Sequence, residues 1–231
     1  RLKVAQVQDF SKGVPVFRVP VSIKLVTPGK TDIRKVWIKE REETFEFPLE
    51  AKPLLVRFDE DNVLIKEITF PKEREELLYQ LKYDDVIGRM DAAAGLLAFK
   101  EDPQTAAGLV ASVRTDPFWA VRKSSLEALA RLKAKNGPAV FKKACQDPDS
   151  QVRAAALVVL GDLKDRTLFD FYKGLFQKDV SYRVQAEALA AIGKAGDPAA
   201  IPFLKQAAAV PSYRDMLRRA AEAALKQFEN K

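Results

Sequence analysis

Hydrophobic and polar residues alternate with a period of two through the first 70 residues. In the segment PVFRVPVSIKLV, the apolar positions include Phe17, Val19, Val21, Ile23 and Leu25. Such alternation is typical of antiparallel sheets that bury one face, and the turn-forming clusters TPGKTD and DEDN separate the alternating segments. With no helical pattern between them, the segments predict a small β-sandwich. Its six expected strands are 2–9, 15–26, 33–39, 43–49, 54–58 and 63–69.

From Pro71 onward the period becomes helical and an internal repeat is visible. The segments VRKSSLEAL, VRAAALVVL and VQAEALAAI begin at residues 121, 152 and 184, a spacing of 31 and 32 residues. A second helical segment joins each pair, and proline at helix starts and glycine after helix ends separate the units. A two-helix repeat of this length predicts an α-solenoid. We therefore expect an α+β multidomain chain, with a β-sandwich domain over residues 1–70 and a helical repeat domain over residues 71–231.

Composition removes several classes of chemistry. The 231 residues include no histidine and a single cysteine, Cys145. Zinc sites rely mainly on histidine and cysteine, and a serine or cysteine nucleophile activated by histidine needs that base. The net charge of +7 is spread thinly along the chain, which argues against nucleic-acid binding. No apolar run approaches the ~18 residues that a membrane-spanning helix requires.

The segment QLKYDDVIGRMDAAAGLL holds the carboxylates most suggestive of acid–base catalysis. Asp84 and Asp85 are adjacent, so on a helix they would diverge by about 100° and would not face one site. One of them is better placed as the cap of the following helix, with the other in the favourable field of its N-terminus. Arg89 lies four residues after Asp85, which is a helix-surface pairing distance. We expect a structural role for all three residues.

The repeat pattern resembles HEAT repeats, particularly the short variant DPxxxVRxxAxxxL. In that family the aspartate and the arginine form a ladder between repeats. The resemblance assigns this role to Asp116 with Arg122, and to Asp147 or Asp149 with Arg153. The third repeat departs from the pattern, because Gln185 replaces the arginine.

Two further segments together resemble the non-catalytic C-terminal region of the aminopeptidase N family of zinc metallopeptidases. They are the sheet segments VQDFSKGVPVFRVPVSIKL and FEFPLEAKPLLVRFDEDNVLIKEITFPK, and the junction ELLYQLKYDDVIGRMDAAAGL. In that family a β-sandwich follows the catalytic domain and a helical superhelix ends the chain. The catalytic motif H-E-x-x-H and the G-x-M-E-N loop are absent here, so no catalytic, metal-binding or cofactor-binding residue is carried over.

The resemblance implies a role without catalysis in this chain. The sandwich would buttress the catalytic domain of the same parent chain, and the solenoid would cap the active-site entrance, meeting peptide substrates only indirectly. Zinc is expected in the missing catalytic domain. The chain starts at Arg1 in a strand-like pattern, so we expect a piece of a longer protein. The alternatives are a free-standing sandwich and repeat scaffold that binds a protein, and a HEAT-like nucleic-acid binder. The compartment cannot be read from the sequence.

Overall fold

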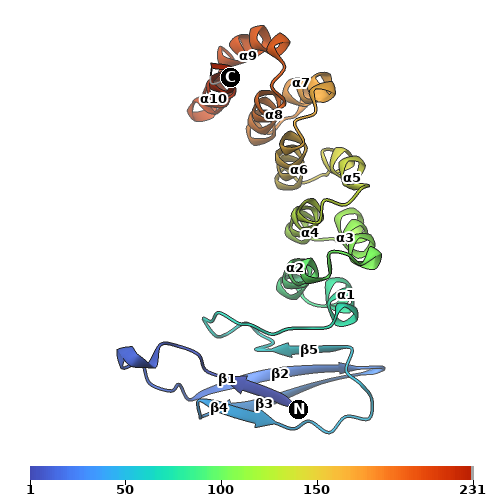
Figure 1. Ribbon diagram of the computed structural model, residues 1–231, viewed down its shortest axis with the longest axis vertical. Helices are drawn as coiled ribbons and strands as arrows, with labels where there is room; N and C mark the ends of the chain where they lie inside the picture. Colours follow the sequence, from blue (N-terminus) through green and yellow to red (C-terminus); the bar gives the residue numbers. More distant parts are fainter. Residues whose placement is uncertain (230–231) are drawn as a thin grey trace. The chain divides into compact units, whose positions relative to one another are not determined.

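A computed structural model describes residues 1–229 of the chain and divides it into two compact units, Arg1–Gln80 and the part that begins at Leu81. The first unit contains the strands and the second contains the helical repeats (Figure 1). Each unit is described separately below.

The first unit holds five short strands in two antiparallel sheets. They are β1 (Leu2–Ala5), β2 (Val19–Thr27), β3 (Lys30–Ile38), β4 (Glu42–Phe45) and β5 (Leu55–Phe58), with a 3-10 turn at Phe10–Lys12. One sheet pairs β1 with β4, and the other has the order β3-β2-β5. A tight hairpin joins β2 to β3, where Pro28 is followed by Gly29 with a φ of 79°. Proline followed by glycine suits the two central positions of a type II turn, because glycine adopts the positive φ of the second position without steric cost.

The alternating residues of β2 form the core of this unit, as the sequence pattern predicts. Val21, Ile23 and Leu25 are buried together with Ile38 of β3. Partly buried apolar side chains from both sheets pack against this cluster, among them Leu2, Val4, Phe45, Phe58 and Leu64. The antiparallel part of the predicted fold class is therefore present, with one hydrophobic cluster shared by two small sheets.

The expectation of a sixth strand over residues 63–69 was wrong, because this segment is irregular. Its amides are bound by a side chain and not by a neighbouring strand. The buried carboxylate of Asp59 accepts hydrogen bonds from the backbone N–H of Val63 (3.1 Å) and of Leu64 (2.9 Å), and it forms an ion pair with Lys66 (2.5 Å). The segment is rich in apolar residues, but only Leu64 packs on the core, while Ile65 is fully exposed.

The first helix, α1 (Arg74–Tyr83), begins within the sheet unit. The Glu76 carboxylate accepts a hydrogen bond from the Val56 N–H of β5 (3.0 Å). Lys72, just before the helix, donates to the Val56 carbonyl (2.7 Å) and to Gln80 (2.8 Å). These bonds tie the start of the helix to the edge strand β5, which explains why residues 71–80 group with the sheets.

The second unit is a stack of helix pairs. Its helices are α2 (Val86–Gly95), α3 (Pro103–Thr115), α4 (Trp119–Arg131), α5 (Gly137–Ala144), α6 (Ser150–Asp162), α7 (Phe169–Lys178), α8 (Tyr182–Ala195), α9 (Ile201–Ala208) and α10 (Met216–Glu229). Short 3-10 turns lie at Leu96–Phe99, Arg166–Leu168, Pro198–Ala200 and Tyr213–Asp215. Aspartates cap several of the helices and turns, as Asp102 does for α3 and Asp197 for the turn before α9.

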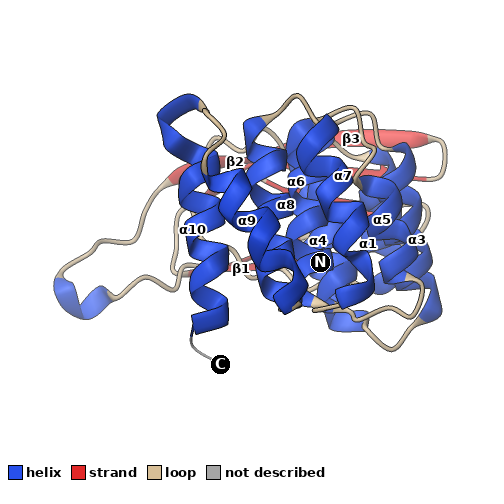
Figure 2. Ribbon diagram, turned by 90° about the horizontal axis from the view of Figure 1, so that it is seen from above, coloured by secondary structure: helices blue, strands red, loops and turns tan. Residues whose placement is uncertain are grey.

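The helices form two layers. In one layer α2, α4, α6, α8 and α10 contact one another in sequence. The other layer includes α3, α5, α7 and α9, which pack against α4, α6, α8 and α10, respectively. In Figure 2, α3, α5, α7 and α9 follow one another from right to left, so successive pairs are turned relative to each other. This is the helical solenoid that the 31- to 32-residue spacing predicts.

Small residues set the closest approach between neighbouring helices of the layer formed by α2, α4, α6, α8 and α10. A Cβ added to Gly193 of α8 would lie 2.7 Å from the Cβ and 2.8 Å from the Cα of Ala224 in α10. One added to Gly161 of α6 would lie 3.1 Å from Ala191 of α8. Because real Cβ atoms do not approach backbone so closely, glycine is needed at position 193.

Candidate functional site

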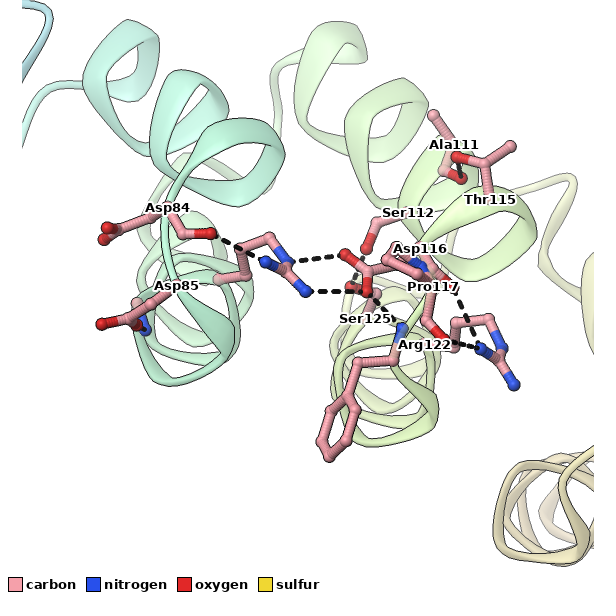
Figure 3. Close-up of polar contacts among 12 residues, drawn as sticks. Asp84, Asp85, Ala111, Ser112, Thr115, Asp116, Pro117, Arg122 and Ser125 are labelled. Atoms are coloured by element: carbon pink, nitrogen blue, oxygen red, sulfur yellow. Dashed lines mark hydrogen bonds and ion pairs between the residues drawn. The ribbon is translucent and has the colours of Figure 1, made fainter.

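Buried arginine–aspartate pairs connect successive helix pairs of the second unit. Arg89 of α2 forms a two-pronged ion pair with Asp116 of the α3–α4 turn, at 2.8 Å from Nε and 3.1 Å from Nη2 (Figure 3). Arg122 of α4 binds Asp147 in the same way, with both distances 2.7 Å, and Arg153 of α6 binds Asp179 at 2.7 and 2.9 Å. We call these three pairs the ladder.

Each pair of the ladder has further bonds that hold its two ends. The Nη1 group of Arg122 donates to the carbonyls of Asp116 (3.0 Å) and Pro117 (3.2 Å), and that of Arg153 donates to the carbonyl of Asp147 (2.9 Å). Each aspartate also accepts from the amide two residues later, as Asp147 does from Asp149 (2.8 Å). Every arginine therefore fixes the turn before its own helix and the turn of the next repeat.

The partners differ from those expected from the sequence. The expected side-chain pair of Asp116 with Arg122 does not form, because Arg122 reaches forward to Asp147. Arg153 likewise pairs with Asp179 and not with Asp147 or Asp149. The arginine lies on the helix after its own turn, so its carboxylate partner is 25 to 27 residues further along the chain. The carbonyl of the nearby aspartate is its second partner.

The two adjacent aspartates that the sequence analysis singled out, Asp84 and Asp85, have structural roles at the start of α2. Asp85 caps α2, accepting from the Gly88 N–H at 2.7 Å. Asp84 is buried, and its carbonyl accepts from Nη1 of Arg89 at 2.7 Å. Arg89 pairs with Asp116 where the sequence suggested Asp85 (Figure 3). Asp149 caps α6 by accepting from the Gln151 N–H at 2.8 Å.

The ladder ends at Asp179, which the sequence reasoning did not include. Gln185 of α8 occupies the arginine position, and its side-chain amide keeps only the bond to the preceding carbonyl, that of Asp179, at 2.6 Å. In the next repeat Ser212 stands where an aspartate would be required, and its hydroxyl accepts from the Leu217 N–H at 3.0 Å. The loss of the arginine is thus matched by the loss of its acidic partner, so no charge is left buried alone.

Burial and charge act together on the ladder. The side chains of Arg122 and Asp147 are only 10% and 8% exposed. The hydrogen bond that Arg122 donates to Asp147 raises the pKa of Arg122, and the one that Arg153 donates to Asp179 raises the pKa of Arg153. For Asp179, burial alone would raise the pKa, but hydrogen bonds from Arg153 and from the Ser181 N–H lower it below its ordinary value. In the pair of Arg153 with Asp179, both shifts therefore favour the ionised forms.

Two other titratable groups lie inside the second unit. Cys145 is buried at the end of α5, and burial raises the pKa of its thiol to about 12. Tyr172 of α7 is fully buried, burial raises the pKa of its phenol, and its hydroxyl has no hydrogen-bond partner among the described residues. A thiol with so high a pKa is a poor nucleophile at neutral pH, so Cys145 packs as a small apolar residue.

The first unit exposes large apolar side chains on one face. β3 is an edge strand, and its residues Ile33 and Trp37 are 56% and 53% exposed. A surface pocket of about 340 Å³ is lined by Trp37 together with Arg18 and Lys39. We call Ile33 and Trp37, with the neighbouring cations Arg18 and Lys39, the β3 face. Sequence alternation places Ile33 and Trp37 on one side of the strand but does not show that this side is uncovered.

Residues 1–229 contain no group of three or more histidine, cysteine, aspartate or glutamate side chains placed to hold a metal ion. None of the helices in this range has the length and apolar character required to cross a membrane.

Comparison with known proteins supports the helical fold. Residues 137–226 match the family of HEAT repeats, and no curated protein matches the chain. The solved complex of CpcE and CpcF of phycocyanin lyase from Nostoc sp. PCC7120 is 23% identical, over 74% of this chain and 70% of that chain, with a TM-score of 0.51. The structure of Legionella pneumophila aminopeptidase A in complex with aspartic acid is 14% identical, over 99% of this chain and 31% of that chain, with a TM-score of 0.49. The family match and the lyase structure agree on a solenoid built from HEAT-like helical repeats.

Proposed function

We propose that this chain is a non-enzymatic scaffold that binds another protein or protein segment. The observation that carries the proposal is the use made of its charged residues. Of the two carboxylates that the sequence offers for acid–base chemistry, that of Asp85 caps α2, and the aspartates of the ladder are held against arginines. Stacked helix pairs fixed in this way offer an extended surface, which is how repeat proteins bind their partners.

The sheet unit supports the same proposal from a different side. The β3 face combines two exposed large apolar side chains, Ile33 and Trp37, with cations, on an edge strand whose outer backbone groups are not paired in the sheet. Exposed apolar patches of this kind are typical of protein contacts, and an edge strand can pair with a further strand. We propose that the two sheets act as a small sandwich that presents this face, since both pack on one cluster.

The more specific proposal is that the chain is the non-catalytic C-terminal part of a zinc aminopeptidase of the aminopeptidase N type. Its support is the sequence resemblance of the sheet segments and of the junction around Asp84, Asp85 and Arg89. In this proposal the β3 face contacts the catalytic domain, and the repeats restrict access of peptides to its entrance. The free-standing scaffold is the second candidate, and the HEAT match favours it equally.

Hydrolysis of aminoacyl-anilides tests the non-enzymatic role. The purified chain should show no hydrolysis above the buffer rate, with or without added zinc. Turnover that a chelator abolishes, and that co-purifies with the folded chain, would refute the proposal.

The reading frame upstream of Arg1 separates the two candidates. An H-E-x-x-H motif there supports the aminopeptidase proposal, and its absence supports the free-standing scaffold. If the motif is present, the upstream domain expressed separately should bind this chain, and Trp37→Ser should weaken that binding. The matched control is Val7→Ser, which removes another exposed apolar side chain of the same unit. Equal weakening by both variants would remove the β3 face from the contact.

A further inference from the structure

A second surface pocket lies in the helical unit, in the layer that includes α3, α5, α7 and α9. It has a volume of about 520 Å³ and lies between the C-terminal ends of α3 and α5. Val113 of α3 with Val140 and Ala144 of α5 form its apolar lining, and Arg114, Lys143 and the α5–α6 turn complete it. This volume falls within the range of about 300–1,000 Å³ that is usual for ligand pockets.

The pocket exists because α5 carries small residues where the next helix of the layer carries large ones. Val140 and Ala144 lie seven and three residues before Asp147. At the same distances before Asp179, α7 has Tyr172 and Phe176, which are both buried. α5 is also short, with 8 residues against 13 in α3. The α5 positions therefore hold smaller side chains than the equivalent positions of α7.

Charge at the pocket is positive. Arg114 and Lys143 are exposed at its rim. Within residues 1–229 no carboxylate pairs with Arg114, and Lys143 has only a long contact of 3.4 Å to the Gln146 side chain. The acid in the lining, Asp147, is bound by both prongs of Arg122 and by the Asp149 N–H, so its charge is already neutralised.

From this combination we propose that the α3–α5 pocket binds an acidic peptide segment of a partner protein. An aliphatic side chain of the peptide enters between Val113, Val140 and Ala144, and a carboxylate next to it meets Arg114 and Lys143. Charge-assisted hydrogen bonds to carboxylate are among the strongest that such cations form. The proposal deepens the scaffold function by naming the partner's chemistry. It fails on peptide binding, whereas the scaffold function fails on chelator-sensitive hydrolysis by the chain.

The experiment is fluorescence anisotropy with a short fluorescein-labelled peptide that alternates glutamate and leucine, titrated with the full chain. Saturable binding is expected. The doubly substituted chain Arg114→Gln, Lys143→Gln should bind at least about tenfold more weakly, as expected for lost charged hydrogen bonds. The matched control is Lys142→Gln, which removes a neighbouring cation whose ammonium lies over the Phe171 ring at 5.0 Å, outside the pocket. This control should bind as the unchanged chain does.

The apolar part of the pocket has its own pair of variants. Ala144→Leu should fill the space and weaken binding, while Ala139→Leu, at an exposed position of the same helix, should not. Circular dichroism confirms that each variant is folded, and the rim variants keep the test valid if Ala144→Leu unfolds. A peptide with serine in place of leucine should bind more weakly. Equal binding by the rim variant and the Lys142 control would overturn the proposal, as would tighter binding of a labelled single-stranded oligonucleotide at the same residues.

Discussion

Replacing Arg122 by glutamine tests whether the ladder stabilises the repeats. The change removes both ion-pair bonds to Asp147 and leaves a carboxylate that is 8% exposed, with the hydrogen bond from the Asp149 N–H as its remaining one among the described residues. Removing one partner of a buried ion pair costs about 3–5 kcal/mol. Glutamine can keep the bond to the preceding carbonyl, as Gln185 does at 2.6 Å. We therefore expect the lower end, about 3 kcal/mol, or a melting temperature lower by roughly 6–12 °C.

The chain itself suggests the compensating change. Asp147→Ser alone should be as harmful as Arg122→Gln, because it leaves the guanidinium buried without its partner. The double variant reproduces the natural combination of Gln185 with Ser212 and should lose less than the sum of the single changes, by about 2 kcal/mol.

The free energy of unfolding is measured by urea denaturation, with circular dichroism and tryptophan fluorescence as the two signals. All variants carry Trp37→Phe, so that the fluorescence comes from Trp119 in the helical unit. Lys123→Gln is the matched control: its residue is next to Arg122 but its contact to Glu127 is 3.7 Å long and partly exposed. It should change stability by less than about 0.5 kcal/mol. A loss from Arg122→Gln no larger than this, or strictly additive single changes, would refute the reasoning.

Three further predictions follow from single residues. Burial alone would raise the pKa of Asp59, but hydrogen bonds from Lys66 and two backbone amides lower it from 3.8. The contribution of Asp59 to stability is therefore full above pH 3.8 and is lost as the pH falls through the lower folded-state pKa. Asp59→Asn should reduce the difference in urea stability between pH 7 and pH 3, and an unchanged difference would contradict the assignment. Cys145 should react with an aromatic disulfide reagent at pH 8 no faster than local unfolding exposes its thiol. Rapid labelling of the folded chain would contradict its burial. Gly193→Ala should lower the free energy of unfolding by about 1–3 kcal/mol through the contact of its new methyl group with Ala224. Gly174→Ala, where a Cβ meets open space, should be neutral or slightly stabilising in the same urea unfolding assay. Equal effects of the two variants would contradict the close approach.

The sequence predicts the repeats well because their information is local. A period of two places Val21, Ile23 and Leu25 in a core, and the spacing of the VR segments places α4, α6 and α8 in equivalent positions. The irregular segment 63–69 shows the limit of this reasoning. Its apolar content is that of a strand, but its first two amides, those of Val63 and Leu64, are bound by Asp59. The hydrophobic pattern carries no information about which group accepts a hydrogen bond.

The ladder was harder to predict because sequence proximity points to the wrong partner. Asp116 lies six residues from Arg122, yet the bonded carboxylate is 25 residues away. One signal could have found it. Where glutamine replaces the arginine, at Gln185, serine replaces the aspartate of the following repeat, at Ser212. Where the arginine is present, at Arg153, the aspartate of the following repeat is present too, at Asp179. This comparison within one sequence indicates that each arginine pairs with the following aspartate. The β3 face and the α3–α5 pocket have no such signal, because exposure depends on what packs above them.

The forward reach of each arginine makes the solenoid extensible in one region only. A copy of residues 116–146 inserted after itself would bring an aspartate for the arginine before it and an arginine for the aspartate after it, so a longer array would keep every pair matched. An insertion after Asp179 would meet Gln185 and Ser212 and would have no charged link to continue. Growth and shortening of this protein by whole repeats, in evolution or by design, should therefore be tolerated between α2 and α8 and resisted near the C-terminal end.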